Sequence, residues 1–189
     1  MIFKLFFLSL AMMLAPVCTW STAKTLADSY EVFPIGESPK PSEWKLFMSM
    51  EMSESQKLWQ YHKNRGKKIT DWAWEWRLGW VRKCILGTDE FCVKILQEGL
   101  RDKALVVRAE TATLIGQRFA SSGHKPAIEL LIQSYRNPSN FRNNKPLWVQ
   151  YRILEAIKRI GGPDAPGIAS KLAGEHASTK SYWIKTNRF

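Results

Sequence analysis

The chain has 189 residues, a formal net charge of +11 and 45% apolar residues. The length suits one domain, and the apolar content excludes a disordered chain. Charged residues at 24% and a mean hydropathy of -0.27 exclude a polytopic membrane protein. The excess of Lys+Arg (28) over Asp+Glu (17) indicates an anionic partner.

Residues 1–23 have the features of a secretory signal peptide. Lys4 gives a positive start, an apolar run covers residues 5–17, and Ala23 follows small residues suited to cleavage. The run is shorter than the roughly 20 residues that a membrane-spanning helix needs. We expect cleavage after Ala23, with Ala27 as the alternative site and lipid attachment at Cys18 as a weaker one. The mature protein is then periplasmic or secreted, without a transmembrane segment.

The mature chain is predicted to be all-α. Residues 24–41 are rich in proline and predict an extended arm. Helices are expected from Ser42, where a short helix begins, and then over 53–65, 72–86, 88–100, 104–119, 125–136, 146–161 and 164–174. The second of these opens on a capping-box pattern at Ser53 to Gln56. No segment alternates long enough to predict a strand, and residues 139–145 read as a polar loop. We expect residues 42–177 to form the helical domain and residues 178–189 a C-terminal tail.

Three predicted helix pairs align with one another. Their first helices align at Trp72, Val107 and Val149, and their second helices at Val93, Ile128 and Ile168. The spacing is 35 residues from Trp72 to Val107, and 42 residues to Val149, where the 139–145 loop intervenes. Self-similarity at such a period is typical of repeat proteins.

One copy of this repeat carries a family resemblance. The stretch Asp102 to Ala112 has a turn Asp, then Val-Arg, then a helix of small residues, and it resembles a HEAT-like repeat of the phycobilisome-lyase type. The copy at Val149 has Gln150 in place of the usual Arg. The resemblance covers about residues 70–174. It implies a short α-solenoid of stacked antiparallel helix pairs, which binds partners on its concave face.

Cys84 and Cys92 are the cysteines that remain after signal cleavage. Cys84 closes one predicted helix and Cys92 opens the next. In an exported chain, two such cysteines predict a disulfide. The alternative is a pair of buried thiols on the packed face.

Tryptophans and basic residues supply the candidate binding residues. Trp72, Trp76 and Trp80 share one helix face and are predicted to be core. Trp74 points the other way and is a candidate for stacking on a sugar, lipid or peptide. Residues 24–56 carry a net charge of -3 and residues 57–189 one of +13. The basic residues fall in two runs, namely Lys57, Lys63, Arg65, Lys67 and Lys68, and Arg142, Lys145, Arg152, Lys158 and Arg159.

The second run supplies three more candidates, Arg142, Lys145 and Arg152, whose alternative is a solvated surface. The sequence contains no nucleophile elbow, phosphate loop or metal-ligand set, so we expect no cofactor, no metal and no catalysis. The predicted function is a binding or scaffold module for an envelope partner, either a protein or an anionic envelope component. A lyase-like or cell-wall enzyme is the first alternative. A nucleic-acid-binding protein is the second, which the export signal disfavours. The oligomeric state stays open.

Overall fold

The computed structural model describes residues 30, 33–87 and 89–187, and the chain divides into two units, residues 1–33 and 34–189. The predicted signal peptide, residues 1–23, lies outside the described residues, as does most of the predicted arm. All the structural features described below lie in the helical body of the second unit.

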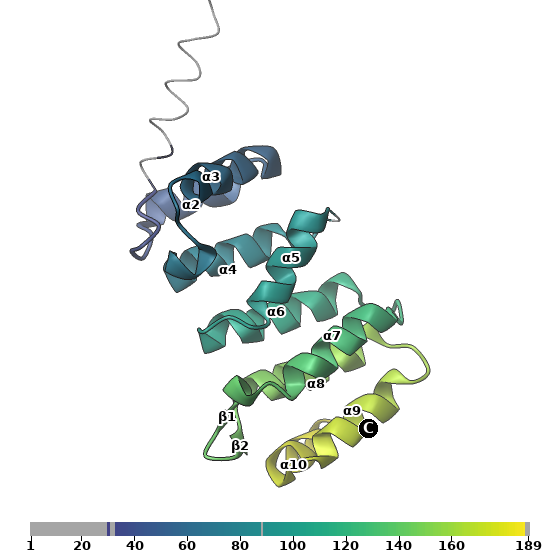
Figure 1. Ribbon diagram of the computed structural model, residues 1–189. Helices are drawn as coiled ribbons and strands as arrows, with labels where there is room; N and C mark the ends of the chain where they lie inside the picture. Colours follow the sequence, from purple (N-terminus) through teal and green to yellow (C-terminus); the bar gives the residue numbers. More distant parts are fainter. Residues whose placement is uncertain (1–29, 31–32, 88, 188–189) are drawn as a thin grey trace, which may run out of the picture. The chain divides into compact units, whose positions relative to one another are not determined.

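The body is built almost entirely of helices (Figure 1), which confirms the all-α prediction. In chain order the elements are α2 (Pro41–Ser49), α3 (Met52–Asn64), the 3-10 helix η1 (Ile69–Asp71), α4 (Trp74–Lys83), α5 (Glu90–Gly99), α6 (Leu105–Arg118), α7 (Lys125–Tyr135), the 3-10 helix η2 (Pro138–Asn140), β1 (Phe141–Arg142), β2 (Lys145–Pro146), α8 (Trp148–Ile160), α9 (Ala165–Gly174) and α10 (Ala177–Thr186).

Local sequence signals explain several helix ends. Asp89 caps α5, where its carboxylate accepts a hydrogen bond of 2.7 Å from the backbone N–H of Cys92. Gly66 and Gly161 have φ values of +73° and +72° and end α3 and α8, a conformation that favours glycine. The predicted capping box at Ser53 is wrong, because α3 already begins at Met52. The backbone N–H of Ser55 donates to the Glu51 carbonyl at 2.9 Å, so the first helical turn closes before Ser53 could act as a cap.

Two segments differ from the sequence prediction. The predicted 139–145 loop contains a β-hairpin, in which Arg142 pairs with Lys145 across Asn143 and Asn144. Both asparagines have positive φ, of 51° and 58°, as a tight type I′ turn requires. Its strands have two residues each, too few to show alternation. The predicted tail forms α10, whose apolar residues are adjacent in sequence instead of spaced at helical intervals.

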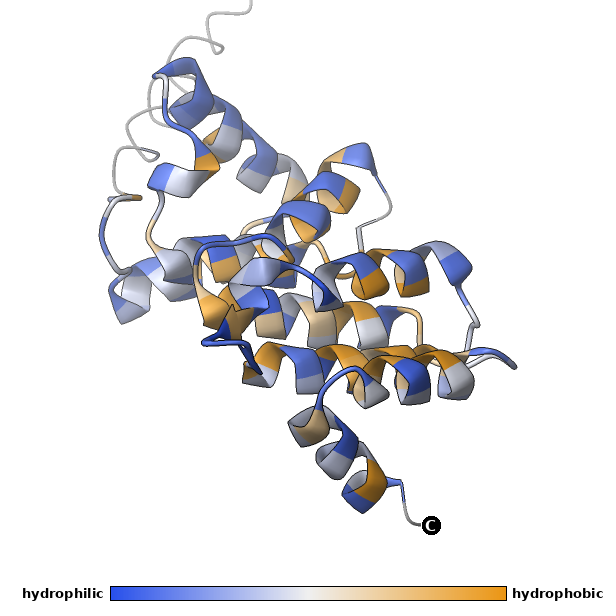
Figure 2. Cartoon of the chain, turned by 60° about the horizontal axis from the view of Figure 1, so that its bottom comes forward, coloured by the Kyte–Doolittle hydropathy of each residue, from blue (hydrophilic) through white to orange (hydrophobic). Residues whose placement is uncertain are grey.

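The first helices of the three aligned pairs pack on one another in order, α4 on α6 and α6 on α8. Aligned positions are buried alike, as at Trp76, Thr111 and Ile153. At Gly116, an added Cβ would lie 2.7 Å from the Cα of Ala156, so α6 and α8 approach closely. Figure 2 shows apolar residues gathered where the helices meet. This packing is compatible with stacked helix pairs, and the HEAT-like solenoid itself stays a prediction.

A ladder of buried polar side chains ties these helices to their connections. Arg77 on α4 is 4% exposed and binds both oxygens of Asp102, at 2.6 Å and 2.8 Å, and also the Trp72 carbonyl. Arg108 on α6 donates to the carbonyl of Asp102 at 2.6 Å and to Asn140 at 2.7 Å. The ladder therefore joins α4, the α5–α6 turn, α6 and η2.

Neutralising Asp102 should be among the most destabilising single changes in the body. Asp102→Asn leaves the buried Arg77 guanidinium without its counter-ion, so we expect a loss of about 3 kcal/mol or more in the free energy of unfolding. Urea denaturation followed by circular dichroism measures this loss. Glu175→Gln is the matched control, because its ion pair with Arg136 (2.7 Å) is exposed and is worth about 1 kcal/mol at most. Equal losses in the two variants would contradict the role of the ladder.

Candidate binding groove

A groove runs along α5 and has two lobes. The first, of about 1020 Å³, is lined by α4, the C-terminal part of α5, the α5–α6 turn, the start of α6 and β1. The second, of about 710 Å³, is lined by α3, the segment before η1 and the N-terminal part of α5. Both lobes are lined by Lys68, Ile69, Ile95 and Glu98, so they are continuous. We call the whole feature the α5 groove.

The first lobe is strongly basic. It is lined by the cations Lys68, Arg77, Arg101, Lys103, Arg108 and Arg142, against the acids Glu98 and Asp102. The side chains of Arg77, Arg108 and Asp102 are already hydrogen-bonded within the ladder. Lys103 donates to the Thr70 carbonyl at 3.0 Å. Burial lowers the pKa of Arg108, which nevertheless keeps its charge at neutral pH. The remaining cations, Lys68, Arg101 and Arg142, are exposed and have no ion pair with any described residue.

The second lobe is aromatic. Trp59 is half-buried and stacks on Trp72 with ring centroids 5.8 Å apart, and it makes a T-shaped contact with Phe91 with ring centroids 5.5 Å apart. Trp72 and Trp80 are buried beneath them. Lysines at positions 63, 67 and 94 also line this lobe. The acids Asp89, Glu90 and Glu98 line it too, so the arrangement offers a rigid apolar surface within a border of mixed charge.

His62 supports the aromatic lobe from inside the body. It is 8% exposed, its ring lies edge-on to Trp72 with centroids 5.2 Å apart, and its Nε2 has no hydrogen-bond partner among the described residues. Burial lowers the pKa of His62, and the nearby charges of Arg65 and Lys67 lower it further. The imidazole is therefore neutral at pH 7.

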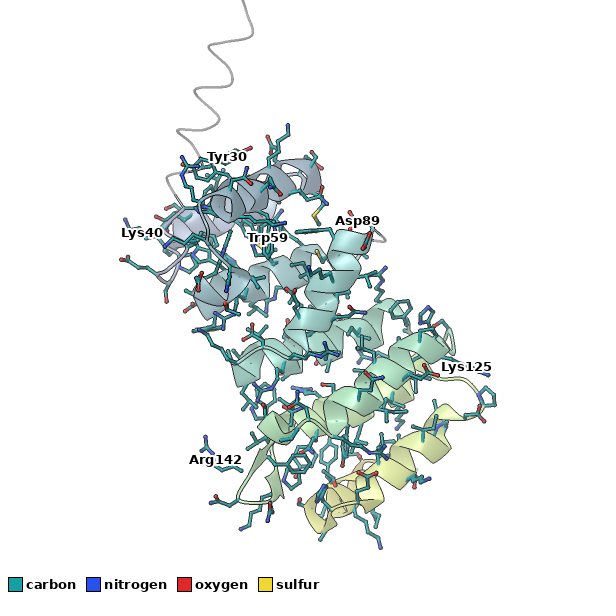
Figure 3. All side chains as sticks on the ribbon, viewed as in Figure 1. Tyr30, Lys40, Trp59, Asp89, Lys125 and Arg142 are labelled. Atoms are coloured by element: carbon teal, nitrogen blue, oxygen red, sulfur yellow. The ribbon has the colours of Figure 1, made fainter. Side chains whose placement is uncertain are left out.

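The four sequence-predicted binding residues do not come together. Only Arg142 lines the α5 groove, where the hairpin brings it; Figure 3 shows it at the hairpin, with Trp59 at the other end. Lys145 pairs with it in register on β2 but does not line the groove. Trp74 is 41% exposed, as predicted for the tryptophan that points away from the core face. It lines a separate, smaller hollow of about 400 Å³ instead of the α5 groove.

Arg152 is engaged elsewhere. Its guanidinium lies 3.1 Å from Glu155, which also accepts a hydrogen bond from the Tyr182 hydroxyl of α10. Burial and the hydrogen bond to Glu155 raise the pKa of Tyr182 to about 12. Arg152 therefore belongs to a contact between α8 and α10, away from the groove.

The groove residues that the sequence missed are Trp59, Phe91, Arg101 and Lys103. Arg101 and Lys103 flank the turn residue Asp102, and this position beside the repeat turn was the available signal. The first basic run was the better guide, because Lys63, Lys67 and Lys68 all line the groove.

Cys84 and Cys92 are both fully buried free thiols, and each affects the pKa of the other. Burial raises the pKa of both thiols. Gly87 lies against Cys92, and an added Cβ there would clash with the Cys92 Sγ. The structure holds the pair as free thiols, and the disulfide stays a prediction.

Comparisons with known proteins found no match among protein-family models, curated proteins or solved structures. Within residues 30, 33–87 and 89–187, no three His, Cys, Asp or Glu side chains gather in a way that could hold a metal ion. Across the same described residues, no helix combines the length and apolar character needed to cross a bilayer.

The buried His62 should make stability depend on pH. Its pKa is lower in the folded state than the ordinary 6.5, so below that pH the unfolded chain binds the proton more readily. This contribution to stability is complete above pH 6.5 and is lost as the pH falls toward the folded pKa. Urea midpoints at pH 7.5 and 5.5 should differ more for the wild type than for His62→Phe. An equal pH dependence in both proteins would contradict this assignment.

Proposed function

We propose that the protein is a non-catalytic binding module that captures an anionic partner in the α5 groove. The observation that carries the proposal is the basic lobe, where Lys68, Arg101 and Arg142 are exposed without an ion pair among the described residues. Unpaired cations over an apolar floor attract an anion and retain it after partial desolvation. Two adjacent lobes of about 1020 and 710 Å³ also suit an elongated ligand.

We further propose that the partner belongs to the cell envelope. The signal-peptide pattern of residues 1–23 supports export, and it disfavours nucleic acid as the natural ligand. The resemblance to HEAT-like repeats supports binding over catalysis, although by analogy of fold alone. A repeat stack would present an extended surface, and the α5 groove is one basic part of the surface of the body.

Charge reversal inside the groove should weaken binding to a polyanion. Lys68→Glu, Arg101→Glu and Arg142→Glu together should weaken the affinity for poly-L-glutamate by about tenfold or more, because three attractive charges become repulsive. Fluorescence anisotropy at low salt measures this affinity. Raising the salt from about 0.05 to 0.3 M should weaken the wild-type complex as well.

The matched control reverses three exposed cations that do not line the groove, in Lys125→Glu, Arg159→Glu and Lys171→Glu. This variant has the same net charge as the groove variant and should bind within about threefold of the wild type, because distant exposed charges are screened. Equal loss in both variants would reduce the interaction to net charge, and the groove proposal would fail.

Export should oxidise the two cysteines. In protein recovered from the periplasm, we expect an intact mass lower by two hydrogen atoms than that of the reduced chain. The Cys84–Cys92 bridge should add about 2–3 kcal/mol to the free energy of unfolding, from loop-closure entropy. Non-reducing mass spectrometry after thiol alkylation under denaturing conditions measures the bond. Two alkylated cysteines in the exported protein would overturn the disulfide.

A further inference from the structure

The two lobes of the α5 groove offer different chemistry at opposite ends of one helix. The aromatic end holds Phe91, in the first turn of α5, beside Trp59. The basic end holds Arg101, just after the last turn of α5, and then Arg142 on the hairpin. A ligand that uses the whole groove must therefore carry an apolar group at one end and negative charge at the other.

The aromatic end is suited to anchoring a large apolar side chain. Trp59 is fixed by three aromatic neighbours: it stacks on Trp72 and makes edge contacts with Trp80 at 5.3 Å and with Phe91 at 5.5 Å. The rings of Phe91 and Trp80 are also in edge contact, at 5.7 Å. Side chains held this firmly lose little conformational entropy on binding, which is characteristic of hot-spot positions.

The basic end is held in place with equal firmness. Arg101 directly precedes Asp102, whose carboxylate and carbonyl are bound by the two buried arginines of the ladder. Arg142 lies on β1, which is paired with β2 across a tight turn. Both guanidinium groups are therefore carried by ordered backbone, and arginine pairs with carboxylates in a bidentate manner.

The length of α5 sets the distance between the two ends. Phe91 and Arg101 are ten residues apart, with Arg101 just beyond the end of α5, and this span corresponds to about 15 Å at the helical rise of 1.5 Å per residue. An extended peptide covers about 15 Å with four to five residues, at about 3.3 Å each. The groove therefore matches a peptide with an apolar residue and a cluster of acidic residues that begins four or five positions away from it. The cluster can lie on either side of the apolar residue in the sequence.

We propose that the ligand of the α5 groove is an extended acidic protein segment with one large apolar residue, preferably aromatic, spaced four to five residues from a cluster of Asp or Glu. This inference rests on the proposed function and specifies its ligand. A uniform polyanion would leave the aromatic end unused. It would also place negative charge against Glu98, which lines both lobes between the two ends.

Glu98 gives the proposal a test by gain of affinity. Its side chain is half-buried, and no ion pair joins it to another described residue. Glu98→Gln removes one negative charge from the middle of the groove and should tighten binding of an acidic peptide by about threefold. Misfolding cannot produce tighter binding, so this result is free of the usual ambiguity of loss-of-function variants.

The decisive experiment uses a series of fluorescent peptides and the purified protein. Each peptide has one Trp, a Gly-Ser spacer and a terminal Asp-Asp-Glu cluster, in both chain directions, with the first acid at i+1, i+4, i+5 or i+10. We expect the tightest binding at i+4 or i+5. Replacing Trp by Ala in the best peptide should weaken binding by about tenfold, because the anchor is lost.

Each outcome separates this inference from the broader proposal. Affinities that are independent of spacing and of the Trp, combined with loss on groove charge reversal, would overturn the peptide ligand and leave anion binding intact. In that case poly-L-glutamate would compete as well as the best peptide at equal carboxylate concentration. Absence of binding by every peptide and by poly-L-glutamate would overturn both proposals. An affinity for the i+4 peptide that is unchanged in Glu98→Gln would also count against the assigned path along α5.

Discussion

The pairing of Arg77 and Arg108 with Asp102 is the interaction on which the rest of the body depends. It places two cations and one carboxylate among packed helices, where each must be satisfied because an unpaired buried charge is costly. Satisfying them fixes the α5–α6 turn against both α4 and α6, and Asn140 extends the restraint to η2. Arg101 and Lys103 flank Asp102 in that turn. The ladder that stabilises the body therefore also positions the basic end of the groove.

In the function that we propose, the groove combines long-range attraction with short-range selection. The positive charge of residues 57–189 would draw an anion toward the protein at a distance, but exposed charges alone discriminate poorly between anions. Selectivity requires groups that bind favourably only to a ligand of complementary shape, and the packed aromatic rings of Trp59 and Phe91 are suited to this. Glu98 adds a penalty for ligands with charge in the wrong place, which is how a binding site rejects near neighbours.

Helix positions and core tryptophans could be predicted from sequence because their causes are local. Glycine at the ends of α3 and α8 and the Asp89 cap act within one turn, and the i, i+4 spacing of Trp76 and Trp80 defines a buried face. The groove could not be predicted in the same way, because Trp59, Phe91 and Arg142 come from three separate elements. The surroundings of Arg152 could not be predicted, because its ion-pair partner Glu155 also binds Tyr182 on α10, a helix with no clear apolar period.

The hairpin of residues 141–146 lies between α7 and α8, and it accounts for most of the longer step from Val107 to Val149 in the predicted repeat alignment. Its tip, at Asn143 and Asn144, is exposed, and its anchor to the ladder is made by Asn140, outside the hairpin itself. Exposed hairpin tips tolerate replacement of their residues far better than packed helices do. The segment is therefore a natural graft point, at which substituted loops would retune what the groove accepts without disturbing the scaffold that holds it.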